Sequence, residues 1–160
     1  MPGDVALRIY LNDHLAGAVA AMELARRCLG NNRQTPLGMY LSSLIGELEA
    51  DRRALEELMR AVGARRDPLK QAAGWLAEKV GRFKLNGRLI GYSDLSRLEE
   101  LEALCLAVEG KRALWRSLAM AGSSNPHLAG FDLGQLERRA RTQRSHLEGH
   151  RRAAARVALG

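Results

Sequence analysis

The sequence contains few aromatic residues and few cysteines. Aromatic residues make up 4% of the 160 positions, whereas Ala and Leu are abundant, as in helical proteins. The two cysteines, Cys28 and Cys105, lie on apolar helical stripes and have no spacing typical of a metal or redox motif. We therefore expect both to be reduced core residues of a cytoplasmic protein.

The sequence also lacks a long apolar run. No stretch approaches the roughly 20 consecutive apolar residues that a membrane-spanning helix needs. The first 14 residues have no basic segment followed by an apolar one, which a secretory signal requires. We expect a soluble cytoplasmic protein that does not contact membranes.

Known catalytic motifs are absent as well. The chain has no glycine-rich phosphate-binding loop, no defensible Ser-His-Asp or Cys-His order and no zinc-ligand spacing. Hydrophobic residues make up 46% and charged residues 27%, which is typical of globular proteins. The length predicts one domain over residues 1–160 with a core of its own.

The net charge of +7 would ordinarily suggest a nucleic-acid partner. However, 21 of the 25 basic residues are Arg, and together with high Ala, Leu and Gly this is the bias of a GC-rich genome. Seven arginines fall near the C-terminus, at Arg138, Arg139, Arg141, Arg144, Arg151, Arg152 and Arg156. They lack interleaved aromatic residues, so a solvated helix face is favoured and a polyanion binder remains an alternative.

Apolar spacing predicts four long helices. They run over about residues 5–29, 36–62, 94–120 and 132–158, with Asp4 as the expected cap of the first. The second helix has an almost unbroken seam at Leu37, Leu41, Leu44, Leu48, Leu55, Leu58 and Val62. Glu99 and Glu100 are expected on a solvated face.

A long segment separates the second and third helices. Asp67-Pro68 can begin a short extra helix, and KLNGRLIGYSD then indicates irregular chain. A connection of this length is unusual in a bundle unless it travels the length of the bundle. The sequence therefore predicts an all-α four-helix bundle with a long crossover that contains a short extra helix.

One long crossover in a four-helix bundle is the ferritin-like arrangement, and over about 130 residues the chain resembles the ferritin-like superfamily. It is similar in particular to small bacterial ferritin-like proteins of unassigned function. The phrase GELEADRRALEELMRAVG resembles the Glu-x-x-His segment of di-iron bundles. The resemblance implies iron or manganese as the cofactor, and bundles of this type commonly form homodimers through exposed apolar strips.

The di-iron motifs of the family are incomplete here. A di-iron centre takes a Glu from each of two helices and Glu-x-x-His from each of the other two. Glu47 is followed three residues later by Ala50, and Gln143-x-x-His146 carries an amide in place of the carboxylate. The alternative interpretation is an atypical metal site with the ligands Glu47, Asp51, His14 and His146.

Polar residues interrupt the apolar seams at about one level of the bundle. They are Asp51, Arg112, Gln143 and His14, with Glu109 nearby. Because a buried carboxylate needs a partner, the favoured interpretation is a structural polar layer in which Arg112 pairs with Asp51 or Glu109. Gln143 and His14 would bind the remaining groups.

These patterns favour a non-catalytic ferritin-like protein without a cofactor, acting in binding or assembly. Two alternatives stay open: a metal-binding oxidoreductase with atypical ligands, and a polyanion or nucleic-acid binder. A small-molecule cavity beside the polar layer is a further possibility.

Overall fold

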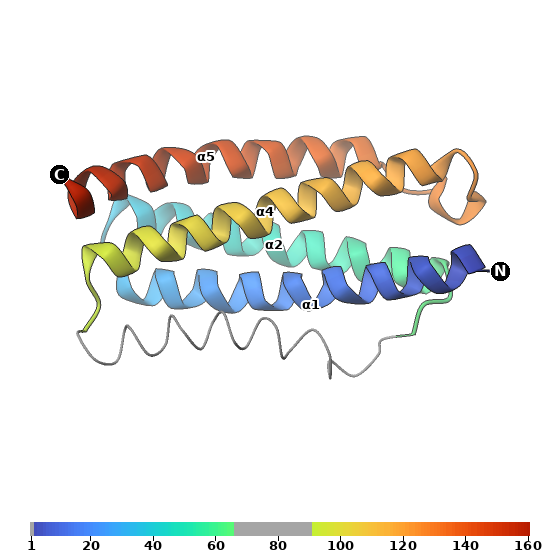
Figure 1. The fold of residues 1–160 in the computed structure, drawn as a ribbon, viewed down its shortest axis with the longest axis horizontal. Coiled ribbons are helices and arrows are strands. Elements are labelled where there is room, and N and C mark those ends of the chain that lie inside the picture. Colours follow the sequence, from blue (N-terminus) through green and yellow to red (C-terminus); the bar gives the residue numbers. More distant parts are fainter. Residues whose placement is uncertain (1, 66–90) are drawn as a thin grey trace.

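The computed structural model describes residues 2–65 and 91–160, and it arranges them as four long helices packed side by side (Figure 1). A short 3-10 helix, η1 (Pro126–Leu128), precedes the last of them. The long helices are α1 (Pro2–Asn31), α2 (Pro36–Ala61), α4 (Asp94–Gly122) and α5 (Leu133–Leu159). The described residues contain no strand, so the prediction of an all-α four-helix bundle is confirmed.

Side-chain caps fix where three of the helices begin. The Thr35 hydroxyl accepts a hydrogen bond from the Gly38 amide at 3.1 Å, and Pro36 takes the first helical position, as predicted. Ser93 and Asp132 cap α4 and α5 in the same way. The predicted cap Asp4 is wrong, because α1 already begins at Pro2 and includes Asp4.

Helix directions give the bundle its topology. In Figure 1, α1 is antiparallel to α2 and α4 is antiparallel to α5, while α2 and α4 run in the same direction. The end of α2 and the beginning of α4 therefore lie at opposite ends of the bundle. The predicted crossover and its short helix fall largely on residues 66–90, outside the described residues.

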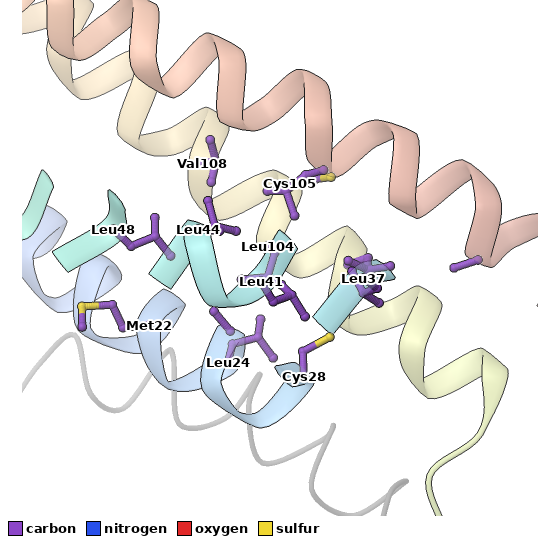
Figure 2. Packing of buried hydrophobic residues seen from close by; sticks show 14 of the residues in the cluster. Met22, Leu24, Cys28, Leu37, Leu41, Leu44, Leu48, Leu104, Cys105 and Val108 are labelled. Atoms are coloured by element: carbon purple, nitrogen blue, oxygen red, sulfur yellow. The ribbon is translucent and has the colours of Figure 1, made fainter. Parts of the chain in front are cut away.

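The core consists of two apolar clusters, one toward each end of the bundle. The first is built around Leu41 and Leu104, and Figure 2 shows its side chains converging between α1, α2 and α4. The second surrounds Trp115 and Leu58. On α2 the first cluster ends at Leu48 and the second resumes at Leu55. The residues between these positions therefore lie midway along the bundle.

None of the helices in residues 2–65 and 91–160 has a stretch both long and apolar enough to cross a lipid bilayer.

Gly38 allows the turn between α1 and α2 to pack closely. A Cβ atom at this position would lie 2.1 Å from the backbone oxygen of Asn32. That oxygen already accepts hydrogen bonds from the amide and hydroxyl of Thr35 at 3.2 and 2.8 Å, so it is not free to move away.

We predict that Gly38→Ala lowers the free energy of unfolding by about 1–3 kcal/mol, because backbone must shift to admit the methyl group. Urea denaturation followed by circular dichroism measures the change. Gly46→Ala is the matched control: its Cβ meets nothing within 4 Å, so it should stabilise α2 by about 0.5–1 kcal/mol. Equal effects of the two substitutions would contradict the close contact.

Candidate functional site: a buried ion-pair layer

Asp51 lies in the middle of the bundle, between the two apolar clusters. Its position continues the seam of α2, which directs its side chain inward, and only 3% of the residue is exposed. A carboxylate removed from water is costly unless charged or polar groups bind it. The identity of its partners therefore decides what this layer can do.

Three side chains from α4 and α5 bind the Asp51 carboxylate. The Lys111 ammonium donates to Oδ2 at 2.5 Å, and Arg139 Nε donates to Oδ1 at 2.6 Å. Gln143 Nε2 donates to Oδ2 at 3.2 Å. The carboxylate thus holds two cations and one amide, and both of its oxygens are used.

Gln143 links this pair to a second carboxylate. It is 2% exposed, and its Nε2 also donates to Glu47 Oε2 at 2.8 Å, while its Oε1 accepts from Lys111. Its backbone oxygen accepts from the Tyr40 hydroxyl at 3.2 Å. The neutral amide therefore donates toward the acidic groups and accepts from the basic one, which orients the layer without adding charge.

The layer is electrically balanced. Lys111 and Arg139 supply two positive charges, and Glu47 and Asp51 supply two negative ones. Burial lowers the pKa of Lys111, and the neighbouring Asp51 carboxylate opposes that shift. Neutrality matters here because an unmatched charge at this depth would cost several kcal/mol.

The predicted pairing of Arg112 with Asp51 is wrong. Arg112 Nε instead donates to Glu137 Oε1 at 2.7 Å, and its side chain is 27% exposed. Its pairing with Glu109, the other predicted option, is confirmed at 3.5 Å. The preceding residue on α4, Lys111, reaches the core because its side chain is long and projects from the neighbouring position.

The predicted histidines lie against tyrosine rings. His14 packs edge-on against Tyr10 with ring centroids 4.5 Å apart. Its described contacts therefore do not include the predicted one with the polar layer. His146 is exposed and meets the Tyr40 ring edge at 6.0 Å, while His150 stacks on the same ring at 4.7 Å. Burial lowers the pKa of both His14 and His150.

The four predicted metal ligands are not all brought together. Glu47 and Asp51 are adjacent through Gln143, but His14 and His146 contact the tyrosines just described. Within residues 2–65 and 91–160, no group of three His, Cys, Asp or Glu side chains could hold a metal ion. The two carboxylates already face Lys111 and Arg139, so the residues present do not fit a di-iron centre.

A second buried network, which was not predicted from the sequence, joins the C-terminal end of α1 to the beginning of α4. Glu100 is 4% exposed, although it was expected in solvent, and it accepts from Arg27 at 2.8 Å and from the Tyr92 hydroxyl at 3.1 Å. The same hydroxyl accepts from Asn32 Nδ2 at 2.8 Å, and Asn32 Oδ1 accepts from Arg97 at 2.9 Å. This directed chain of bonds fixes the start of α4 against the α1–α2 turn.

Both cysteines are free and buried, as predicted. Burial and the nearby Glu100 carboxylate raise the pKa of the Cys28 thiol to about 12. Burial also raises the pKa of Cys105. Since the thiolate is the reactive form, both groups are unreactive core residues at neutral pH.

The arginines of α5 divide into three groups. Arg139 belongs to the buried layer, and Arg144, Arg151 and Arg152 all bind Glu148. Arg138, Arg141 and Arg156 are exposed, and so is Arg152 despite its bond to Glu148. These contacts leave only part of the predicted basic face available to a partner.

Comparison with known proteins gives no relative: no family model, no curated protein and no solved structure matches this chain.

We predict that Glu100→Gln lowers the free energy of unfolding by about 1.5–3 kcal/mol, because it removes charge-assisted hydrogen bonds from Arg27 and Tyr92 in a buried setting. The adjacent Glu99→Gln should stay within about 0.5 kcal/mol of the parent. Thermal unfolding of both variants tests this, and a similar loss in both would contradict a specific role for Glu100.

The half-buried His14 predicts that the stability of the protein depends on pH in the acidic range. Because burial lowers the pKa of folded His14 below the ordinary histidine value of 6.5, the stability that this group contributes is complete above pH 6.5 and falls as the pH drops below it. We expect His14→Gln to reduce the loss of stability on acidification, measured by urea denaturation from neutral to mildly acidic pH. The exposed His127→Gln serves as control and should retain the parental profile.

Proposed function

We propose that this protein is a non-catalytic ferritin-like bundle in which an ion-pair layer takes the place of a di-iron centre, and that it serves in binding or assembly. The four long helices support the ferritin-like assignment, as does the shared direction of α2 and α4. The observation that carries the proposal is the Lys111 ammonium bound to Asp51 Oδ2 at 2.5 Å.

Lys111 supplies the positive charge that a metal would otherwise bring to these carboxylates. It binds Asp51 and Gln143 together, and Arg139 covers the remaining oxygen of Asp51. A metal entering beside Asp51 would face repulsion from both cations and would have to displace at least one of them. The layer therefore favours a structural role over metal chemistry.

The structural role is to hold three helices in register. Asp51 and Glu47 come from α2, Lys111 from α4, and Arg139 and Gln143 from α5. The backbones of α2 and α5 approach each other closely at few positions, so these side chains supply much of their connection. A one-turn slip of any helix would leave a buried charge without its partner, which makes the alternative registers costly.

We expect Asp51→Leu alone to lower the free energy of unfolding by about 3–5 kcal/mol, since it strands the Lys111 charge in the core. Adding Lys111→Met should recover much of this loss, because it removes the more deeply buried of the two cations that Asp51 binds, while Arg139, whose side chain is 34% exposed, can still reach solvent. Urea denaturation of the single and double variants measures both effects. Failure of the second substitution to restore stability would contradict the pairing.

Arg112→Met is the matched control for Lys111→Met. It removes the neighbouring cation of α4 from a partly exposed pair, so its effect on the free energy of unfolding should be much smaller than that of Asp51→Leu.

Metal analysis tests the absence of a resident metal directly. Protein purified after growth with added iron and manganese should carry no stoichiometric amount of either. Stoichiometric metal that is lost in a Glu47→Ala, Asp51→Ala variant with native circular dichroism would overturn the proposal in favour of the oxidoreductase.

A further inference from the structure

One surface of α4 combines exposed apolar and acidic side chains. Leu106 and Met120 are 73% and 81% exposed, and Glu102 and Glu109 each expose about half of their side chains. Steps of three, four and seven residues place all of them on one stripe of the helix. The stripe consists of Leu95, Glu102, Leu106, Glu109, Ala113 and Met120.

The neighbouring helix α5 carries a stripe of opposite charge with small residues at its centre. Arg141 and Arg152 are exposed, and between them lie Ser145 and Gly149, where an added Cβ would meet nothing within 4 Å. The stripe ends in Leu159, which is 73% exposed. It consists of Gly134, Arg138, Arg141, Ser145, Arg152 and Leu159.

Ion pairs place both stripes on the same side of the α4–α5 pair. Glu102 reaches across to Arg151 at 3.6 Å, and Arg151 shares Glu148 with Arg152. Farther along, Arg112 joins Glu109 to Glu137 in the same way. These ion pairs cross from α4 to α5 and join residues that belong to the two stripes or lie next to them in sequence. The two stripes therefore lie side by side on one continuous face.

The same bridges show which residues lie at the same level. Since α4 and α5 are antiparallel (Figure 1), the contact of Glu102 with Arg151 places Glu102 level with Arg152. Counting along both helices from that level puts Leu106 between Ser145 and Gly149, Glu109 beside Ser145, and Ala113 beside Arg141. Leu95 falls level with Leu159, and Met120 with Gly134. The three exposed apolar residues of the α4 stripe therefore lie beside apolar or small residues of α5, and Glu102 lies beside Arg152.

We propose that this face binds a second copy of the chain, forming a two-fold symmetric dimer in which α4 of each copy packs on α5 of the other. A two-fold axis parallel to the helices exchanges the two stripes and preserves every level. Each Glu102 then meets Arg152 of the other copy, and each Leu106 enters the gap at Ser145 and Gly149. Because this face is complementary to itself in charge and shape, its expected partner is a second copy of the chain rather than a different protein.

The available area is adequate for a stable dimer. Two helices about 40 Å long and 10 Å wide present ~800 Å² per copy, which matches standard protein–protein interfaces. Four of the eight large apolar side chains exposed in the described part of the chain lie on this face.

The dimer would give the assembly role proposed above its partner. It rests on surface residues alone, so the test of the buried layer and the test of the dimer can fail independently.

Sedimentation of the full chain tests the dimer. The parent should sediment at twice the chain mass of 17.6 kDa, and Leu106→Glu should shift it toward monomer. Met39→Glu, which alters an equally exposed apolar residue on α2, is the control and should leave the dimer intact. A monomeric parent at high micromolar concentration would overturn the proposal, as would a dimer that Leu106→Glu leaves unchanged.

Charge reversal tests the pairing itself. In a dimer of Glu102→Arg, two arginines face each other at both contacts, and in a dimer of Arg152→Glu two acids face each other at both contacts. Each substitution alone should therefore raise the dimer dissociation constant about tenfold or more. An equimolar mixture of the two variants should restore dimerisation, because both contacts of the mixed dimer are again Arg with Glu. Restoration also shows that both variants are folded.

A mixture that stays monomeric would exclude packing of α4 on α5. Association that requires added DNA duplex at low salt would instead identify the α5 stripe as a polyanion site and would likewise overturn the proposal.

Discussion

The contact between Asp51 and Lys111 sets the constraint to which the middle of the bundle conforms. Once a carboxylate occupies the α2 seam, α4 must supply a cation at its level, and α5 must supply groups for the remaining oxygens. Gln143 suits this position because its amide donates to two acids and accepts from one base. The apolar clusters on either side supply the free energy of burial, while this layer determines the alignment of the helices.

The helices were predictable because their apolar spacing and caps are local signals. Thr35-Pro36 and Ser93 mark the starts of α2 and α4 in sequence as they do in space. Asp51 and Gln143 were also recognisable as interruptions of otherwise apolar seams, and both are buried. Patterns of this kind depend only on neighbours along one helix.

The partners of Asp51 were not predictable in the same way. Arg112 fits the periodicity of the α4 seam, yet Lys111 makes the contact because its flexible side chain reaches inward from the next position. The burial of Glu100 was not predictable because its partner Arg27 lies far away along the chain, and nothing near Glu100 in the sequence indicates that contact. Packing against the other helices sets the rotation of each helix about its axis, and this rotation decides which of two adjacent residues points into the core. The apolar periodicity of one helix does not encode it.

The position of the polar layer between two apolar clusters also divides the molecule into halves. Leu41 and Leu104 belong to one half, and Leu58 and Trp115 to the other, with charged groups rather than interlocking hydrocarbon between them. Volume changes in one half are therefore poorly transmitted to the other, so substitutions on opposite sides of the layer should combine additively. Either half of the core can thus diverge in sequence while the central ion pairs keep the four helices aligned.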